Sequence, residues 1–146
     1  MATFKEKRFL EPKEVDPAKK SELLSVIGQQ LQGRAEILFA YVHGSFVKEE
    51  EFRDIDVGIY LGSPRDLFYE SDLSHELSQR TGMEVEVRAI QDAPLPFQMA
   101  VVRDGKLLFS RNEELRTDFI ERTSKRYPEY AHFRNLFLGI EGVRRQ

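Results

Sequence analysis

The fold of this chain is decided by residues 37–61, which read ILFAYVHGSFVKEEEFRDIDVGIYL. Ile37 to His43 is an apolar run of aromatic and branched residues, which is typical of a buried strand. Gly44 and Ser45 interrupt this run, and a short charged segment leads to a second apolar run from Val57 to Leu61. The pattern predicts two strands that are joined by a polar loop.

Asp54 and Asp56 open the second strand, with a single residue between them. Side chains alternate across a strand, so these two carboxylates share a face. Two like charges beside a buried strand repel each other and lose part of their hydration. A cation between them would offset both costs. Mg²⁺ prefers oxygen ligands and usually takes carboxylates together with substrate phosphates. The pair therefore predicts a magnesium site, and a pair of turn or cap aspartates is the alternative.

Gly44 and Ser45 can supply the groups that bind phosphates. A glycine lets the backbone approach a phosphate closely, free N–H groups at a helix start attract anions, and Ser45 adds a hydroxyl donor. A lone Gly-Ser is more often an ordinary turn, but beside the aspartate pair it predicts a nucleoside triphosphate site. Lys48 either reaches the γ-phosphate or is a solvated charge beside the glutamates that follow it, and Arg53 is a weaker phosphate candidate.

Gly-Ser, a short spacer and Asp-x-Asp together resemble the signature of the DNA polymerase β-like nucleotidyltransferase superfamily. The length of the chain is similar to that of proteins in the minimal branch of that superfamily, the MNT or MntA-like antitoxins. The spacer, residues 46–53, is shorter than is usual in that branch. Lys48 stands where the branch usually has an arginine, and Glu49 stands where it has a glycine. The similarity runs from Ile37 to Tyr130.

Residues 83–90 predict a third strand, in which Glu84 and Glu86 share one face. This segment precedes an Ala-Pro and is similar to the family segment that carries a third carboxylate, with Glu86 at the matching position. The resemblance implies that Glu86 contacts metal and acts as the general base for the attacking hydroxyl. Glu84 is the competitor for that role, and an exposed glutamate that pairs with Arg88 is the alternative.

The composition bounds the class of protein. The chain has 146 residues, of which 40% are apolar and 32% charged, and this balance is typical of one soluble domain. The net charge of −3 argues against a dedicated nucleic-acid-binding module. Without cysteine there is neither a disulfide framework nor a cysteine-based zinc site. The first residues show no signal peptide, and no apolar run approaches the ~20 residues of a membrane span, so we expect a cytoplasmic protein.

We expect a single α/β (α+β) nucleotidyltransferase domain, with a mixed β-sheet of about four strands flanked by helices. The predicted division is an N-terminal arm and helix (1–35), the minimal nucleotidyltransferase domain (36–127) and a C-terminal tail (128–146) that packs on the domain or on a partner. Helices are predicted after Asp16 as far as Gly33, from Pro64 to Arg80 with Ser63 as the cap, from Phe97 to Val102, and from Glu113 to Tyr127 between Asn112 and Pro128.

The resemblance implies Mg²⁺-dependent transfer of a nucleoside monophosphate to a hydroxyl, with pyrophosphate as the leaving group. Two Mg²⁺ ions would be held by Asp54, Asp56 and Glu86, and ATP is the implied donor. Similar minimal proteins are antitoxins that transfer AMP to a tyrosine of a HEPN-type toxin. Because the spacer is short, a catalytically weak or inactive nucleotide- or partner-binding module remains an alternative. Nucleotidylation of a small molecule is a third possibility.

Overall fold

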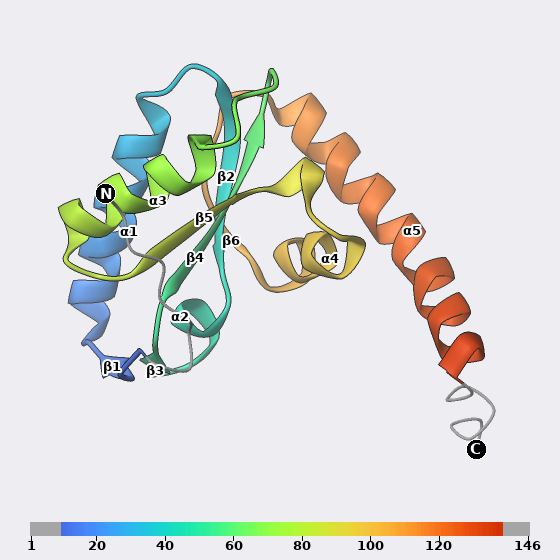
Figure 1. Ribbon diagram of the computed structural model, residues 1–146, viewed down its shortest axis with the longest axis horizontal. Coiled ribbons are helices and arrows are strands. Elements are labelled where there is room, and N and C mark those ends of the chain that lie inside the picture. The colour runs from blue at the N-terminus through green and yellow to red at the C-terminus, as the bar shows by residue number, and fades with distance from the viewer. Residues whose placement is uncertain (1–9, 139–146) are drawn as a thin grey trace.

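The computed structural model describes residues 10–138 (Figure 1). Four strands form the central sheet in the order β5-β4-β2-β6, in which β4 and β5 are parallel and the other pairs are antiparallel. These strands are β2 (Ile37–His43), β4 (Ile55–Leu61), β5 (Val85–Ala89) and β6 (Lys106–Ser110). The expected mixed sheet is confirmed. A second, two-stranded sheet joins β1 (Lys13–Glu14) to β3 (Glu51–Phe52).

Helices cover both faces of the central sheet (Figure 1). The larger ones are α1 (Pro17–Gln32), α3 (Tyr69–Thr81), α4 (Leu95–Asp104) and α5 (Glu113–Leu138), and α2 (Ser45–Lys48) is a single turn. The helices α1 and α3 lie on one side of the sheet, and α4 and α5 lie on the other (Figure 1). A 3₁₀ turn at Ile90–Asp92 follows β5. No helix among the described residues is long and apolar enough to cross a membrane.

The helix α1 begins and ends as the sequence predicts. The carboxylate of Asp16 accepts a hydrogen bond of 2.8 Å from the backbone N–H of Lys19, which caps the first turn. Gly33 follows the last turn. The helix buries its apolar stripe against the sheet through Leu23, Ile27 and Leu31.

The strands of the sheet alternate between two apolar clusters. In β4 and β5, every second residue faces the core under α1 and α3, including Val57 and Val87. The residues between them face α4 and α5, where a smaller cluster contains Phe39, Val101 and Phe119. This second face is apolar under α4. It becomes polar toward the start of β4, where polar side chains can form a site.

The helix α3 closes the outer edge of β5 with side chains. Three side chains on one face of α3 accept hydrogen bonds from alternate backbone N–H groups of β5. The pairs are Ser78 with Val85 (2.9 Å), Ser74 with Val87 (2.8 Å) and Glu70 with Ala89. The acceptors are four residues apart on the helix, a rise of about 6 Å, and the donors are two residues apart on the strand, a rise of about 6.6 Å. The spacing of the acceptors therefore matches that of the donors. These contacts fix where β5 stands beside β4.

The predicted start of the helix α3 is wrong, because the helix begins at Tyr69 rather than Pro64. Ser63 does not cap it. Leu67 and Phe68, two apolar residues near the start of the predicted helix, are 87% and 63% exposed. Without burial, nothing offsets the entropy of ordering another helical turn. Instead the Asp66 carboxylate accepts a hydrogen bond of 2.9 Å from the N–H of Phe68 and forms a local turn.

The predicted end of the last helix at Pro128 is also wrong, because α5 continues to Leu138. Asn112 caps this helix as expected, and its side chain accepts a 3.0 Å hydrogen bond from the N–H of Leu115. A proline inside a helix removes one hydrogen bond to the residue four positions earlier. Here that residue, Ser124, is exposed, so water can satisfy its carbonyl. The apolar and basic end of the predicted tail, Ile140 with Arg144 and Arg145, lies outside the described residues.

Candidate functional site

Three carboxylates meet at one end of the central sheet. Asp54 immediately precedes β4, Asp56 lies within it, and Glu86 lies on the parallel neighbour β5, directly beside Asp56 in the register. One oxygen from each carboxylate lies within 4.8 Å of the others. Asp54 is only 5% exposed, and the other two are partly buried. The structure therefore brings together the three residues that the sequence singled out as metal ligands.

Glu84, the competing glutamate, does not belong to this cluster. Its backbone carbonyl accepts a hydrogen bond of 2.8 Å from the N–H of Ile55, just before β5 begins. That contact sets the register in which Glu86, one pleat further along, stands beside Asp56. The geometry therefore favours Glu86 over Glu84 as the third carboxylate.

Gly44 packs directly against the carboxylate of Asp56. Its φ of 81° and ψ of −162° lie in a region that only glycine enters readily. A Cβ atom added at this position would clash with the side-chain oxygen Oδ2 of Asp56. The register explains the approach, since His43 pairs with Asp56 across β2 and β4. The glycine thus brings the backbone after β2 to the edge of the acidic cluster.

Ser45 begins the single turn α2, directly after Gly44. The N–H groups of Val47 and Lys48 donate to the Gly44 carbonyl at 3.1 and 3.2 Å, and Phe46 is buried beneath the turn. Among the described residues, Gly44 and Ser45 are therefore held next to the acidic cluster, where a phosphate-binding pair is expected.

The two basic candidates make other contacts. The Lys48 ammonium lies 3.6 Å from the Asp104 carboxylate at the end of α4. A hydrogen bond from Arg103, together with Lys48, keeps the pKa of Asp104 below its usual value, so this carboxylate stays charged at neutral pH. Arg53 donates a 3.1 Å hydrogen bond from Nε to the carbonyl of Leu10. These contacts do not bring either residue to the acidic cluster. The phosphate roles of Lys48 and Arg53 therefore remain predictions.

Sequence reasoning missed Lys20 of α1, whose ammonium donates to the carbonyls of Phe46 and Glu49 at 2.7 and 2.8 Å. No motif marks this lysine, because its partners are backbone groups far away in the sequence. Sequence reasoning also missed Phe97 of α4, which stacks under the Arg88 guanidinium at 4.5 Å and meets the His43 ring edge-on at 4.9 Å.

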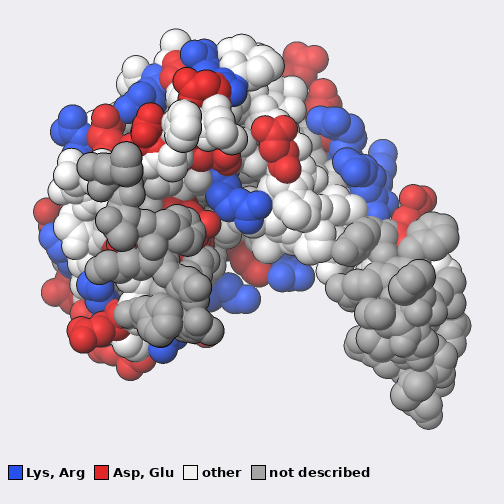
Figure 2. All heavy atoms as spheres, viewed as in Figure 1, with Lys and Arg blue, Asp and Glu red and all other residues white. Residues whose placement is uncertain are grey.

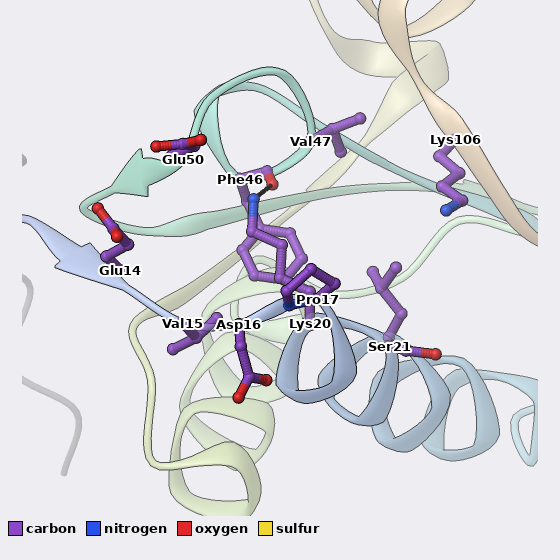
Figure 3. A pocket seen from close by; sticks show the side chains of 11 residues that line it. Glu14, Val15, Asp16, Pro17, Lys20, Ser21, Phe46, Val47, Glu50 and Lys106 are labelled. Carbon is purple, nitrogen blue, oxygen red and sulfur yellow. Dashed lines mark hydrogen bonds between the residues drawn. The ribbon is translucent and has the colours of Figure 1, made fainter.

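An open pocket of about 560 Å³ is lined by residues of α1, β1, α2 and β6 (Figure 3). Lys20, Phe46 and Lys106 line it, but none of the three clustered carboxylates does. On the face drawn in Figure 2, acidic and basic side chains of the described residues are interspersed rather than gathered into a basic surface.

The donor set of the cluster suits a hard divalent cation. Three carboxylates with converging oxygens provide only oxygen ligands, and Mg²⁺ prefers such ligands. Placing three acidic groups so close together has an electrostatic cost that a divalent cation would offset. The site therefore has the chemistry for a metal ion, with the Gly44–Ser45 backbone beside it for an anionic substrate.

A known protein family matches more than half of the chain. A model of the family described as polymerase beta nucleotidyltransferase matches residues 26–114, which include the whole acidic cluster. No curated protein sequence matches the chain.

Solved structures share the fold at low sequence identity. A chain in the complex of a tri-AMPylated Shewanella oneidensis HEPN toxin with an MNT antitoxin is 18% identical, with a TM-score of 0.70, over 82% of this chain and 96% of that one. A toxin–antitoxin structure with AMP-PNP gives 19% identity and a TM-score of 0.66 over 86% and 97% of the two chains. An MntA–HepT toxin–antitoxin structure gives 15% and 0.64 over 85% and 97%. With the family match covering more than half of its length, the chain belongs to the polymerase β nucleotidyltransferase family.

Proposed function

We propose that this protein is a Mg²⁺-dependent nucleotidyltransferase that transfers AMP from ATP to a hydroxyl group of a partner protein. The observation that carries the proposal is the convergence of Asp54, Asp56 and Glu86 within 4.8 Å, next to Gly44, where an added Cβ would clash with the Asp56 carboxylate. Similar folds occur in structures of toxin–antitoxin complexes, one with AMP-PNP and one with a tri-AMPylated HEPN toxin. A HEPN-type toxin is therefore the partner that we propose.

In this mechanism, Asp54, Asp56 and Glu86 would hold two Mg²⁺ ions, which would neutralise charge on the triphosphate and activate the acceptor hydroxyl. Gly44 and Ser45 bind and orient the phosphates through a backbone N–H and a hydroxyl. Glu86 accepts the proton of the acceptor hydroxyl. The acceptor oxygen then forms a bond to the α-phosphorus, the bond from that phosphorus to the bridging oxygen breaks, and pyrophosphate leaves.

Lys48 and Arg53 take secondary roles in the proposal. Lys48 would reach the γ-phosphate by leaving its exposed ion pair with Asp104, and such an exchange costs little because exposed ion pairs are weak. Arg53 stands next to Asp54 in the sequence, but it is held by the Leu10 carbonyl. It is therefore the weaker of the two phosphate candidates.

The test is a transfer assay with labelled ATP, read by intact mass. The purified chain is incubated with ATP and Mg²⁺, with and without a HEPN-type toxin, and a parallel sample contains EDTA. We expect the toxin to gain the mass of AMP only in the presence of chain, ATP and Mg²⁺. A stable complex with no mass gain would instead favour a binding module without turnover. Label on a small molecule rather than on the toxin would mean that the acceptor is a small molecule and not a protein.

A further inference from the structure

The turn α2 is too short to be stable by itself. It has four residues, Ser45–Lys48, and isolated helices need several turns to be stable in water. Its end presents carbonyl groups that have no partner further along a helix. Whatever holds this turn also sets the positions of Gly44 and Ser45 relative to the acidic cluster.

Lys20 provides that support from a different helix. Its ammonium donates to the Phe46 carbonyl at 2.7 Å, within the turn (Figure 3). It also donates to the Glu49 carbonyl at 2.8 Å, at the end of the turn. The same nitrogen lies 5.1 and 5.7 Å from the ring centroids of Phe46 and Phe52. A positive charge at the C-terminal end of a helical turn also complements the dipole of its peptide groups.

The lysine itself is well anchored. Its backbone N–H donates to the Asp16 carbonyl at 3.0 Å in the first turn of α1, the turn that the Asp16 side chain caps. Lys19 provides the contrast, since it points to solvent and forms an exposed ion pair with Glu22 at 3.7 Å. Of these two adjacent lysines, only Lys20 places its ammonium on the turn.

We propose that Lys20 is a positioning residue of the nucleotidyltransferase site, which fixes α2 so that Gly44 and Ser45 meet the triphosphate beside Asp56. This inference rests on the proposed function. Lys20 contacts the loop and not the reacting atoms, so its loss disturbs the alignment of the phosphates while the carboxylates stay in place. A misplacement of about 1 Å in a substrate-positioning group can reduce a rate about a hundredfold.

The test compares four proteins: the unaltered chain, Lys20→Met, Lys20→Arg and Lys19→Met. Methionine keeps an apolar stem over the Phe46 and Phe52 rings but removes the donors, and arginine restores them. Calorimetric titration with AMP-PNP and Mg²⁺ measures nucleotide binding, and titration with Mn²⁺ alone measures the carboxylates. We expect Lys20→Met to bind AMP-PNP about tenfold more weakly, with unchanged Mn²⁺ affinity, whereas Lys20→Arg and Lys19→Met resemble the unaltered chain.

The outcomes separate this inference from the proposed function. If the unaltered chain does not bind AMP-PNP with Mg²⁺, the proposed function fails and the inference fails with it. If the unaltered chain binds and Lys20→Met binds equally well, even with a lowered melting temperature, Lys20 is merely structural and only the inference is overturned. If Lys20→Met does not fold, Lys20→Gln, which keeps an uncharged amide donor on a shorter side chain, is expected to give an intermediate affinity, and unaltered affinity there overturns the inference.

Discussion

The two faces of the central sheet use the same strands but carry different side chains. Toward α1 and α3, the side chains of β4 and β5 are apolar along their whole length. Toward α4 and α5, the same strands begin with Asp56 and Glu86, and only further along do they pack against Ile90 and Val101. One face therefore contributes buried apolar side chains along its whole length. The other face has carboxylates in place of apolar side chains at one end. The comparison teaches that stability and chemistry can be altered separately in this domain.

The largest effect is expected from Asp54→Asn combined with Asp56→Asn on the polar face. Asparagine keeps the shape of each side chain but removes the charges that would bind Mg²⁺, so transfer should fall by at least about a thousandfold. The melting temperature should stay the same or rise, because like charges are removed from a crowded site. Transfer assays and thermal unfolding measure the two effects, and retained transfer would show that the metal assignment is wrong.

Glu86→Gln should reduce the transfer rate by about a hundredfold, since a positioned general base contributes at least that much. ATP affinity should change less than the rate. Glu84→Gln is the matched control, because Glu84 is on the same strand face but outside the cluster. Steady-state kinetics on both variants measure how much of the transfer rate each one loses. If Glu84→Gln has the larger effect, the third carboxylate has been assigned to the wrong residue.

Ile59→Ala tests the apolar face. Ile59 is fully buried under α1 and α3, and removing its side chain should cost about 2–5 kcal/mol of unfolding free energy through lost burial and a cavity. The transfer rate per folded molecule should be nearly unchanged. Urea unfolding, together with activity below the transition, provides the measurement. A large loss of activity in the folded variant would mean that the two faces are coupled.

Gly44→Ala and Gly82→Ala form a second matched pair. Both glycines have a positive φ, so alanine strains the backbone by about 1–3 kcal/mol at either position. Only Gly44 packs on the Asp56 carboxylate, whereas an added Cβ at Gly82 meets nothing. Both variants should lose some stability, but only Gly44→Ala should also lose metal and nucleotide affinity. Equal effects on binding would place Gly44 outside the site.

The smallest effect concerns pH on the apolar side, at the hydrogen bond of 2.6 Å from the Tyr69 hydroxyl to Glu36. Burial and this bond raise the pKa of Tyr69 to about 12. The folded value lies above the unfolded value of about 10, so the stability from this contact is complete below pH ~10 and is lost as the pH rises toward 12. Melting temperatures between pH 9 and 12 should fall less steeply in Tyr69→Phe. Identical profiles would show that this contact does not contribute.

The aspartate pair could be predicted from the sequence because strand periodicity is a local rule. Residues two apart share a face, which pairs Asp54 with Asp56, whereas only the resemblance to the family favoured Glu86 over Glu84. The four strands and the cap at Asp16 follow from local patterns in the same way. These signals need no knowledge of which segments meet in space.

The remaining features depend on contacts between distant segments. Lys20 could not be assigned because its partners are backbone carbonyls, which leave no trace in a sequence. The start of α3 was mispredicted because Leu67 and Phe68 look like core residues but are exposed. Pro128 is a strong local stop signal, yet α5 continues past it at an exposed position.

The contacts between α3 and β5 have a consequence for association between chains. The unpaired backbone groups of a strand at the edge of a sheet form a template on which another chain can pair. The side chains of Glu70, Ser74 and Ser78 accept hydrogen bonds from backbone N–H groups along the outer edge of β5. The helix α3, which lies outside the acidic cluster, therefore keeps the edge strand that carries Glu86 from pairing with another chain.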